Sequence, residues 1–174
     1  MSTSMIEIEF SDNLTREHPT IVAQLNAAIH SQHLNIFLCA TEGPLVYPGR
    51  KTIGWSGVGS RLAMVWLNAQ EVLQLVFDGQ LLNFVNEFRR HCGHQHSSQQ
   101  TWAILYGLHA HEEYQMCQEL VERALAQVEV FTGIHLVPVD TEVKAVTEIL
   151  SVAQAIQSLK LMRGSMTLGY WGPT

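Results

Sequence analysis

The chain has 174 residues, a length that can bury one hydrophobic core. Apolar residues make up 47% of it and charged residues only 15%, a composition that excludes a disordered chain. No apolar run approaches the roughly 18 residues of a membrane span, and no basic segment precedes an apolar one near the N-terminus, so we expect neither a transmembrane helix nor a signal peptide. The net charge of −6, with only three lysines, argues against unaided binding of a phosphate backbone.

The three cysteines are an odd number without paired spacing, which argues against a disulfide framework. Cys39 lies in an apolar run and Cys117 on an apolar helical face, where a thiol acts as a small hydrophobic group. The sequence therefore favours a reducing compartment, the cytosol or the nucleus. The low charge also suggests that part of the surface is apolar and covered by something else.

The first elements follow from the spacing of apolar residues. Residues 5–10 alternate isoleucine or phenylalanine with glutamate, which predicts a strand with one wet face. Pro19 can begin a helix, and apolar residues recur at helical spacing between Ile21 and Ile29. The segment 35–40, NIFLCA, predicts a short buried strand.

The middle of the chain combines turns with strongly apolar segments. Five glycines and two prolines fall within residues 41–60, which predicts turns around a short strand at 51–55. Residues 61–67, RLAMVWL, predict a buried strand. Asn68 then caps a helix, and Glu71, three residues later, supplies the reciprocal half of a capping box.

Helices and strands continue to alternate after Gly79, which separates the helix begun at Asn68 from a second one. The polar segment 91–100 predicts a loop, and residues 101–108, TWAILYGL, predict a buried strand. An amphipathic helix follows over 112–131 and stops at Gly133.

A strand over 134–139 and a last helix, capped by Asp140 or Thr141, complete the pattern. Apolar strands joined by helices predict an α/β domain of three layers, with a central, largely parallel sheet flanked by helices. The opening strands and the glycine-rich segment could add an antiparallel portion.

No complete catalytic set emerges from the residues. The segment GWSGVGS, residues 54–60, lacks the strand-to-helix context of a dinucleotide-binding loop and the lysine and hydroxyl of a phosphate-binding loop. The chain contains no GxSxG nucleophile elbow. Glu7, Glu9, Asp12 and Glu42 could together bind a divalent ion through oxygen, but no lysine stands at a spacing that would complete a nuclease site.

A histidine cluster offers alternative chemistry, because neutral imidazole and thiolate are good zinc ligands. The candidate ligands are His91, Cys92, His94, His96, His109 and His111. Their spacing matches no familiar zinc finger, and the neighbouring serines and glutamines are typical of an exposed loop. A metal-dependent enzyme and a solvated polar loop therefore both remain open.

Basic residues near the glycine-rich segment and at the end of one helix are candidate DNA contacts, because clustered positive charge can bind phosphate. They are Arg50, Lys51, Arg61, Arg89 and Arg90. Ordinary solvated surface is the other interpretation of these residues.

Three stretches carry a family resemblance: KTIGW with RLAMVWLNAQEVLQLVFDGQLLNFVNEF, then TWAILYGL with ALAQVEVFTG, and finally IHLVPVDTEVKAVTEILSVAQAI. Their order resembles the nuclease-fold domain of the XPF family of structure-specific endonucleases, in particular its non-catalytic, Eme-type subunits. The resemblance covers residues 5–163. It implies a restriction-endonuclease-like fold in a single domain, residues 1–163, with residues 164–174 as a C-terminal tail or truncated linker.

The sequence departs from the family at the catalytic motif. Active members carry GD followed later by ERKxxxD, whereas the nearest sequence here is PGRKTIGW, in which Gly49 replaces the glutamate and no acidic residue follows at the required spacing. Carboxylates are needed to hold the magnesium that assists phosphodiester hydrolysis. The resemblance therefore implies a pseudo-nuclease without a cofactor. Such a subunit or scaffold would pair with a homologous nuclease in DNA repair or recombination in the nucleus, and would reach branched DNA through the complex.

Obligate pairing requires an apolar contact surface. The candidate interface residues are Trp55, Phe77, Leu82, Tyr170 and Trp171. Trp66 is a further candidate, although its place in an apolar strand favours the core. A protein-binding adaptor on an α/β scaffold, unrelated to DNA, is the remaining alternative.

Overall fold

The computed structural model describes residues 5–40, 49–57, 60–92 and 101–170, with the backbone alone for residues 40, 56, 57, 60, 61 and 159–170. The strands are β1 Ile6–Phe10, β2 Ile36–Ala40, β3 Lys51–Gly57, β4 Ser60–Asn68, β5 Trp102–Tyr106 and β6 His135–Val139. The helices are α1 Asp12–Glu17, α2 Pro19–Ser31, α3 Ala69–Phe77, α4 Leu81–His91, α5 Glu112–Met116, α6 Gln118–Thr132 and α7 Glu142–Tyr170.

The strands form one mixed sheet in the order β2-β1-β3-β4-β5-β6. β3 runs antiparallel to both neighbours, whereas the β1–β2, β4–β5 and β5–β6 pairs are parallel. The α/β class with a largely parallel sheet is thus confirmed, and the antiparallel portion includes the glycine-rich segment as expected. Because β3 alone is reversed, its first residue lies at the edge where the other strands end.

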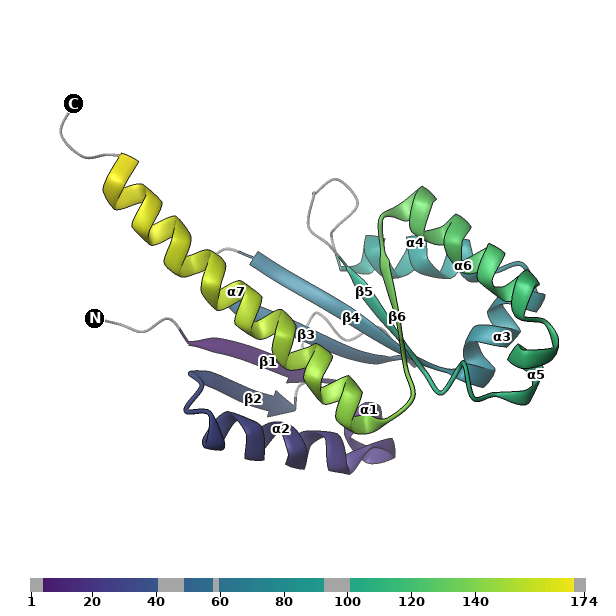
Figure 1. The fold of residues 1–174 in the computed structure, drawn as a ribbon, viewed down its shortest axis with the longest axis horizontal. Coiled ribbons are helices and arrows are strands. Elements are labelled where there is room, and N and C mark those ends of the chain that lie inside the picture. Colours follow the sequence, from purple (N-terminus) through teal and green to yellow (C-terminus); the bar gives the residue numbers. More distant parts are fainter. Residues whose placement is uncertain (1–4, 41–48, 58–59, 93–100, 171–174) are drawn as a thin grey trace.

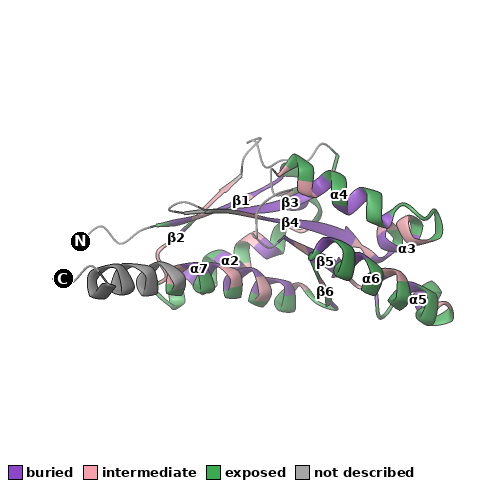
Figure 2. Ribbon diagram, turned by 90° about the horizontal axis from the view of Figure 1, so that it is seen from above, coloured by how far each residue is buried: buried purple, intermediate pink, exposed green. Residues whose placement is uncertain are grey.

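The two faces of the sheet bury separate hydrophobic cores. One core packs residues of β1, β3 and β4 against α2 and α7, and the other packs β4 and β5 against α3, α4 and α6. In β4, Met64 and Trp66 belong to the first core while Val65 and Leu67 belong to the second, as the two-residue period of a strand requires. Figures 1 and 2 show α2 and α7 side by side along one face of the sheet. Figure 1 shows α3 to α6 together on the right, next to β5 and β6.

Several expected helix boundaries are present. Asn68 and Glu71 form the predicted capping box at the start of α3. Gly133 ends α6 with a φ of 72°, in the left-handed region that glycine adopts without strain. The hydroxyl of Thr141 accepts from the backbone N–H of Lys144 at 3.2 Å in the first turn of α7.

Three features differ from the sequence-based expectations. The polar segment Asp12–Glu17 forms α1, which buries only Leu14. The expected helix over 112–131 is two helices, α5 and α6, because the backbone leaves helical geometry at Cys117. His91 ends α4 instead of opening a loop.

The last helix continues to Tyr170, beyond the expected end of the domain at residue 163. The separate tail over 164–174 stays a prediction, since the side chains of α7 from residue 159 onward lie outside the described residues. Among the described residues, no helix has the length and apolar character needed to cross a bilayer.

Candidate functional site

The edge of the sheet where β1, β4, β5 and β6 end, here named the carboxyl edge, is where α/β proteins usually bind ligands. In this chain three rings fill part of it. The His18 ring lies 4.9 Å from that of Trp66 and 5.3 Å from that of Tyr106, and the last two rings are 5.1 Å apart. Trp66 is completely buried, and its Nε1 donates to Asn68 Oδ1 at 3.1 Å. The core interpretation of Trp66 is thus confirmed, and we name His18, Trp66 and Tyr106 the aromatic cluster.

A carboxylate from the last helix binds the aromatic cluster to α2. Glu142 Oε1 lies 3.0 Å from Nδ1 of His18, and its other oxygen accepts from the hydroxyl of Thr20. These hydrogen bonds, first from Thr20 and then from His18, lower the pKa of Glu142. The carboxylate of Glu142 therefore joins two helices that are far apart in sequence.

A second group of charges lies at the same edge, where β3 begins. Lys51 is 5% exposed, and its Nζ donates to Glu17 Oε2 at 2.8 Å and to Glu71 Oε1 at 3.1 Å. Glu71 also accepts from Arg50 at 3.1 Å and from the backbone N–H of Asn68 at 3.2 Å. The hydrogen bond from Lys51 is the main cause that lowers the pKa of Glu17. We name Glu17, Arg50, Lys51 and Glu71 the carboxylate–cation network.

These two clusters limit the chemistry of the carboxyl edge. The carboxylates of Glu17, Glu71 and Glu142 are held by an ammonium, a guanidinium, a hydroxyl and an imidazole. A magnesium ion needs several oxygen ligands and here would have to displace the buried Lys51 ammonium. Among the described residues, the one group of three metal-ligating side chains contains none of these residues and lies on β1 and β2.

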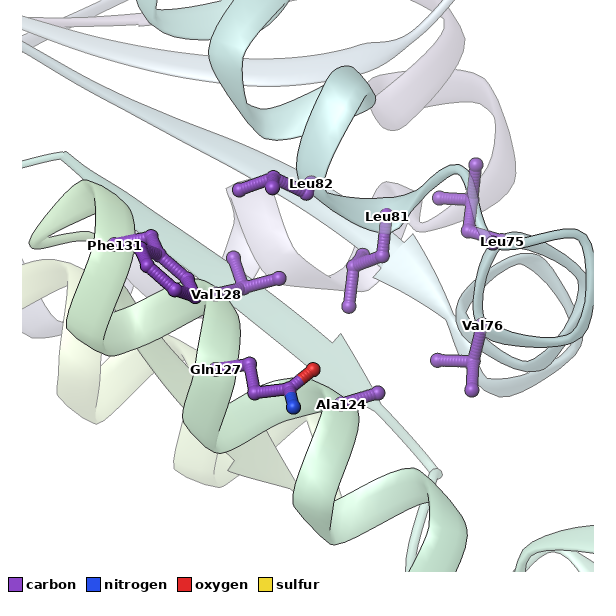
Figure 3. A pocket seen from close by; sticks show the side chains of 9 residues that line it. Leu75, Val76, Leu81, Leu82, Ala124, Gln127, Val128 and Phe131 are labelled. Carbon is purple, nitrogen blue, oxygen red and sulfur yellow. The ribbon is translucent and has the colours of Figure 1, made fainter.

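An apolar groove lies between the α3–α4 pair and α6 and encloses about 140 Å³. Figure 3 shows its lining, which is Leu75, Val76, Gly79, Leu81, Leu82, Ala124, Gln127, Val128 and Phe131. Phe131 is 75% exposed and Leu82 is 37% exposed at its rim. We name this feature the α4–α6 groove.

Comparison with solved structures identifies the fold. XPF from Aeropyrum pernix in complex with DNA superimposes on 87% of this chain, with a TM-score of 0.61 and 13% sequence identity. A second structure of XPF from Aeropyrum pernix superimposes on 86% of this chain, with a TM-score of 0.61 and 15% sequence identity. The chain has the XPF nuclease fold. It spans less than two thirds of those XPF chains, 65% and 60% of their length. No protein-family model matches the chain, and no curated protein matches its sequence significantly.

On this XPF fold, the candidate DNA contacts occupy different environments. Lys51 stays a predicted DNA contact, but its buried ammonium is held by two carboxylates, which disfavours binding to phosphate. Arg50 is half-buried, with its guanidinium 4.6 Å from the centre of the Phe84 ring, and Arg89 donates to the carbonyl of Thr132. Arg90 is exposed at the end of α4, and the side chain of Arg61 lies outside the described residues.

The interface candidates divide in the same way. Phe77 is 46% exposed at the end of α3, and the partly exposed Leu82 lines the α4–α6 groove. Trp55 also stays a prediction, but it is completely buried beneath α2 and α7, on the same strand face as Ile53, which favours a role in the core. The side chain of Tyr170 and the whole of Trp171 lie outside the described residues.

The histidine candidates do not form a metal centre among the residues that the structure describes. His109 Nε2 lies 3.7 Å from Glu122, which also accepts from the hydroxyl of Tyr114, and His111 caps α5 by accepting from a backbone N–H. Burial raises the pKa of the Cys92 thiol to about 11, and His91 is exposed at the end of α4. His94 and His96 lie outside the described residues.

The sequence analysis did not identify several residues of the carboxyl edge and of the α4–α6 groove. His18, Glu17 and Glu142 lie in polar segments without a motif, and Phe131 lies beside the buried stripe of α6. The alternation along β3 did carry a usable signal, because Lys51, Ile53 and Trp55 share one face of that strand. Their common face leads into the core.

Proposed function

We propose that this chain is a catalytically inactive, XPF-like subunit that pairs with a homologous, active nuclease subunit in DNA repair or recombination. The observation that carries the proposal is the composition of the carboxyl edge. There Lys51, a buried cation, lies between two carboxylates, and the Trp66 ring fills the neighbouring space. Such an edge can keep the architecture of a nuclease while lacking open ligands for a catalytic magnesium ion.

The α4–α6 groove supports the pairing half of the proposal. The exposed side chains of Leu82 and Phe131 at its rim are costly to leave in water and typical of the centre of an interface. A homologous nuclease-fold domain can cover such a surface with helices of its own. A stable pair would bury roughly 800 Å² on each partner.

The charges of the chain suggest that DNA is reached through the complex. The net charge is −6, and Lys51 and Arg50 are engaged with carboxylates. The similar XPF structure contains DNA, and an active partner would supply most of the phosphate contacts for this chain. Arg90 is the exposed candidate for a direct contact, and work on chromosomal DNA implies a nuclear location.

Co-expression with each XPF-like nuclease from the same cell tests the proposal. We expect the chain alone to show no magnesium-stimulated cleavage of branched DNA, and the purified pair to cleave it. Changing the carboxylates of the partner should abolish cleavage, whereas Glu71→Gln in this chain should leave it. Cleavage by the isolated chain that Glu71→Gln removes would disprove catalytic inactivity.

A stable pair that binds and cleaves no DNA would instead support the adaptor function. A chain that remains monomeric with every XPF-like nuclease of its cell would remove the pairing. A fluorescent fusion excluded from the nucleus would contradict the assigned process.

A further inference from the structure

A group of metal-ligating atoms lies on the β1–β2 pair and shares no residue with the aromatic cluster or the carboxylate–cation network. Glu7 and Glu9 belong to β1 and Cys39 belongs to β2, and the Cα partner of Glu9 is Cys39. Side chains alternate along a strand, so these three residues share the face opposite Ile6 and Ile8, which are buried in the first core. One oxygen or sulfur atom from each of the three lies within 4.8 Å of the other two.

We propose that Glu7, Glu9 and Cys39 form a binding site for a thiophilic divalent cation, for which zinc is the natural candidate. A thiolate with two carboxylates suits zinc or cadmium and disfavours magnesium, which prefers oxygen ligands alone. This donor set differs from the all-oxygen set that magnesium-dependent phosphodiester hydrolysis requires. The site is therefore a separate property of the chain, independent of whether it pairs with a nuclease.

The spacing of the donors fits such an ion. With Zn–S near 2.3 Å and Zn–O near 2.0 Å, the donors of a tetrahedral zinc site lie roughly 3.3 to 3.5 Å from one another. Donor atoms within 4.8 Å of each other need to approach by little more than about 1 Å, which glutamate torsions allow. Neighbouring strands fix the backbone beneath all three residues, and water can complete the coordination.

The group combines a thiol with two carboxylates, whose negative charge attracts a cation. The thiol of Cys39 donates to Glu7 Oε1 at 2.9 Å, and all three side chains are half-buried. Burial, followed by the hydrogen bond to Glu7 and the charges of Glu7 and Glu9, raises the pKa of Cys39 to about 12. A bound divalent ion would displace the thiol proton, form the metal–sulfur bond and neutralise the carboxylate charge.

One proton leaves the thiol for each ion bound, and this gives the site a signature. Because a thiol with its ordinary pKa of about 8.5 is mostly protonated at neutral pH, the apparent affinity should rise about tenfold for each unit of pH between roughly 6 and 8. Carboxylates that bind a cation nonspecifically release no such proton at these pH values.

Titration of the full, chelator-treated chain with cadmium tests the site, because cadmium bound to thiolate absorbs in the ultraviolet. We expect one ion per chain with this absorption, displacement by zinc, and no displacement by excess magnesium. Cys39→Ser should remove the absorption, whereas Cys92→Ser and Cys117→Ser, at the two other free thiols, should keep it.

Glu7→Gln and Glu9→Gln retain the thiol and should each weaken binding by at least about tenfold. Circular dichroism of each variant distinguishes lost ligation from lost folding. Absorption that persists in a folded Cys39→Ser variant, or affinity that is insensitive to both glutamine changes, would overturn the site.

Discussion

At the scale of single residues, Lys51 decides the character of the carboxyl edge. Its ammonium is almost inaccessible to water and is compensated by the carboxylates of Glu17 and Glu71. Removing one member of a buried ion pair leaves the other uncompensated, which costs more than the pair contributes. Because both carboxylates are partly exposed, solvent screening reduces that cost here.

We expect Lys51→Met to lower the free energy of unfolding by about 2 kcal/mol at neutral pH. The lowered pKa of Glu17 contributes stability that is fully present above pH 4.5, its ordinary pKa, and is lost as pH falls through the folded value. The variant should therefore lose less stability than the native chain on acidification below that pH. Urea unfolding across this range measures both effects.

Lys144→Met is the matched control, because the Lys144–Asp140 pair on α7 is exposed and 3.5 Å apart. Its effect should stay within about 0.5 kcal/mol. Equal effects of the two changes would show that burial of Lys51 is energetically unimportant.

At the scale of elements, local pattern was sufficient for most strands and helices, and contacts across the chain were not. Alternation predicted β1, the capping box of Asn68 predicted α3, and Gly133 predicted the end of α6. α1 escaped because its only buried side chain is Leu14. The hydrogen bond between His18 and Glu142 joins residues 124 positions apart, a separation that no local pattern encodes.

Gly133 gives a test at this scale, because its φ of 72° allows the chain to turn from α6 into β6. No atom lies within 4 Å of a Cβ added there, so any cost arises in the backbone alone. We expect Gly133→Ala to destabilise the chain by about 1–2 kcal/mol, and Gly133→Asn, which tolerates this conformation better, to cost less. Thermal unfolding of both variants measures the difference, and an alanine variant as stable as the native chain would contradict it.

At the scale of the whole molecule, the two faces of the sheet differ in how completely their helices cover apolar side chains. One core is closed by α2 and α7, whereas the other leaves exposed apolar side chains along the α4–α6 groove. Under the proposed pairing, this asymmetry directs the partner toward the groove. The sequence indicated a covered apolar surface through its low charge, but the pairing of α4 with α6 required the fold.

We expect Leu82→Glu and Phe131→Glu to weaken association with the nuclease partner by at least about tenfold, because each introduces a carboxylate into the apolar groove. Val143→Glu is the control, since Val143 is 64% exposed on α7, remote from the groove residues. Analytical ultracentrifugation of the mixed subunits gives the affinities. A loss confined to the control would assign the contact to the opposite side of the sheet.

The alternation of side chains along β3 also restricts which mutations this chain can accept during evolution. Successive residues of β3 face opposite sides, so an insertion or deletion that slides the strand by one position would exchange its two faces. Lys51 would turn away from Glu17, and the buried ring of Trp55 would leave the core for the side that Thr52 and Gly54 now occupy. Single substitutions within β3 change one side chain at a time. A one-residue shift of the strand would abolish both the pairing of Lys51 with its carboxylates and the packing of Trp55 in the core.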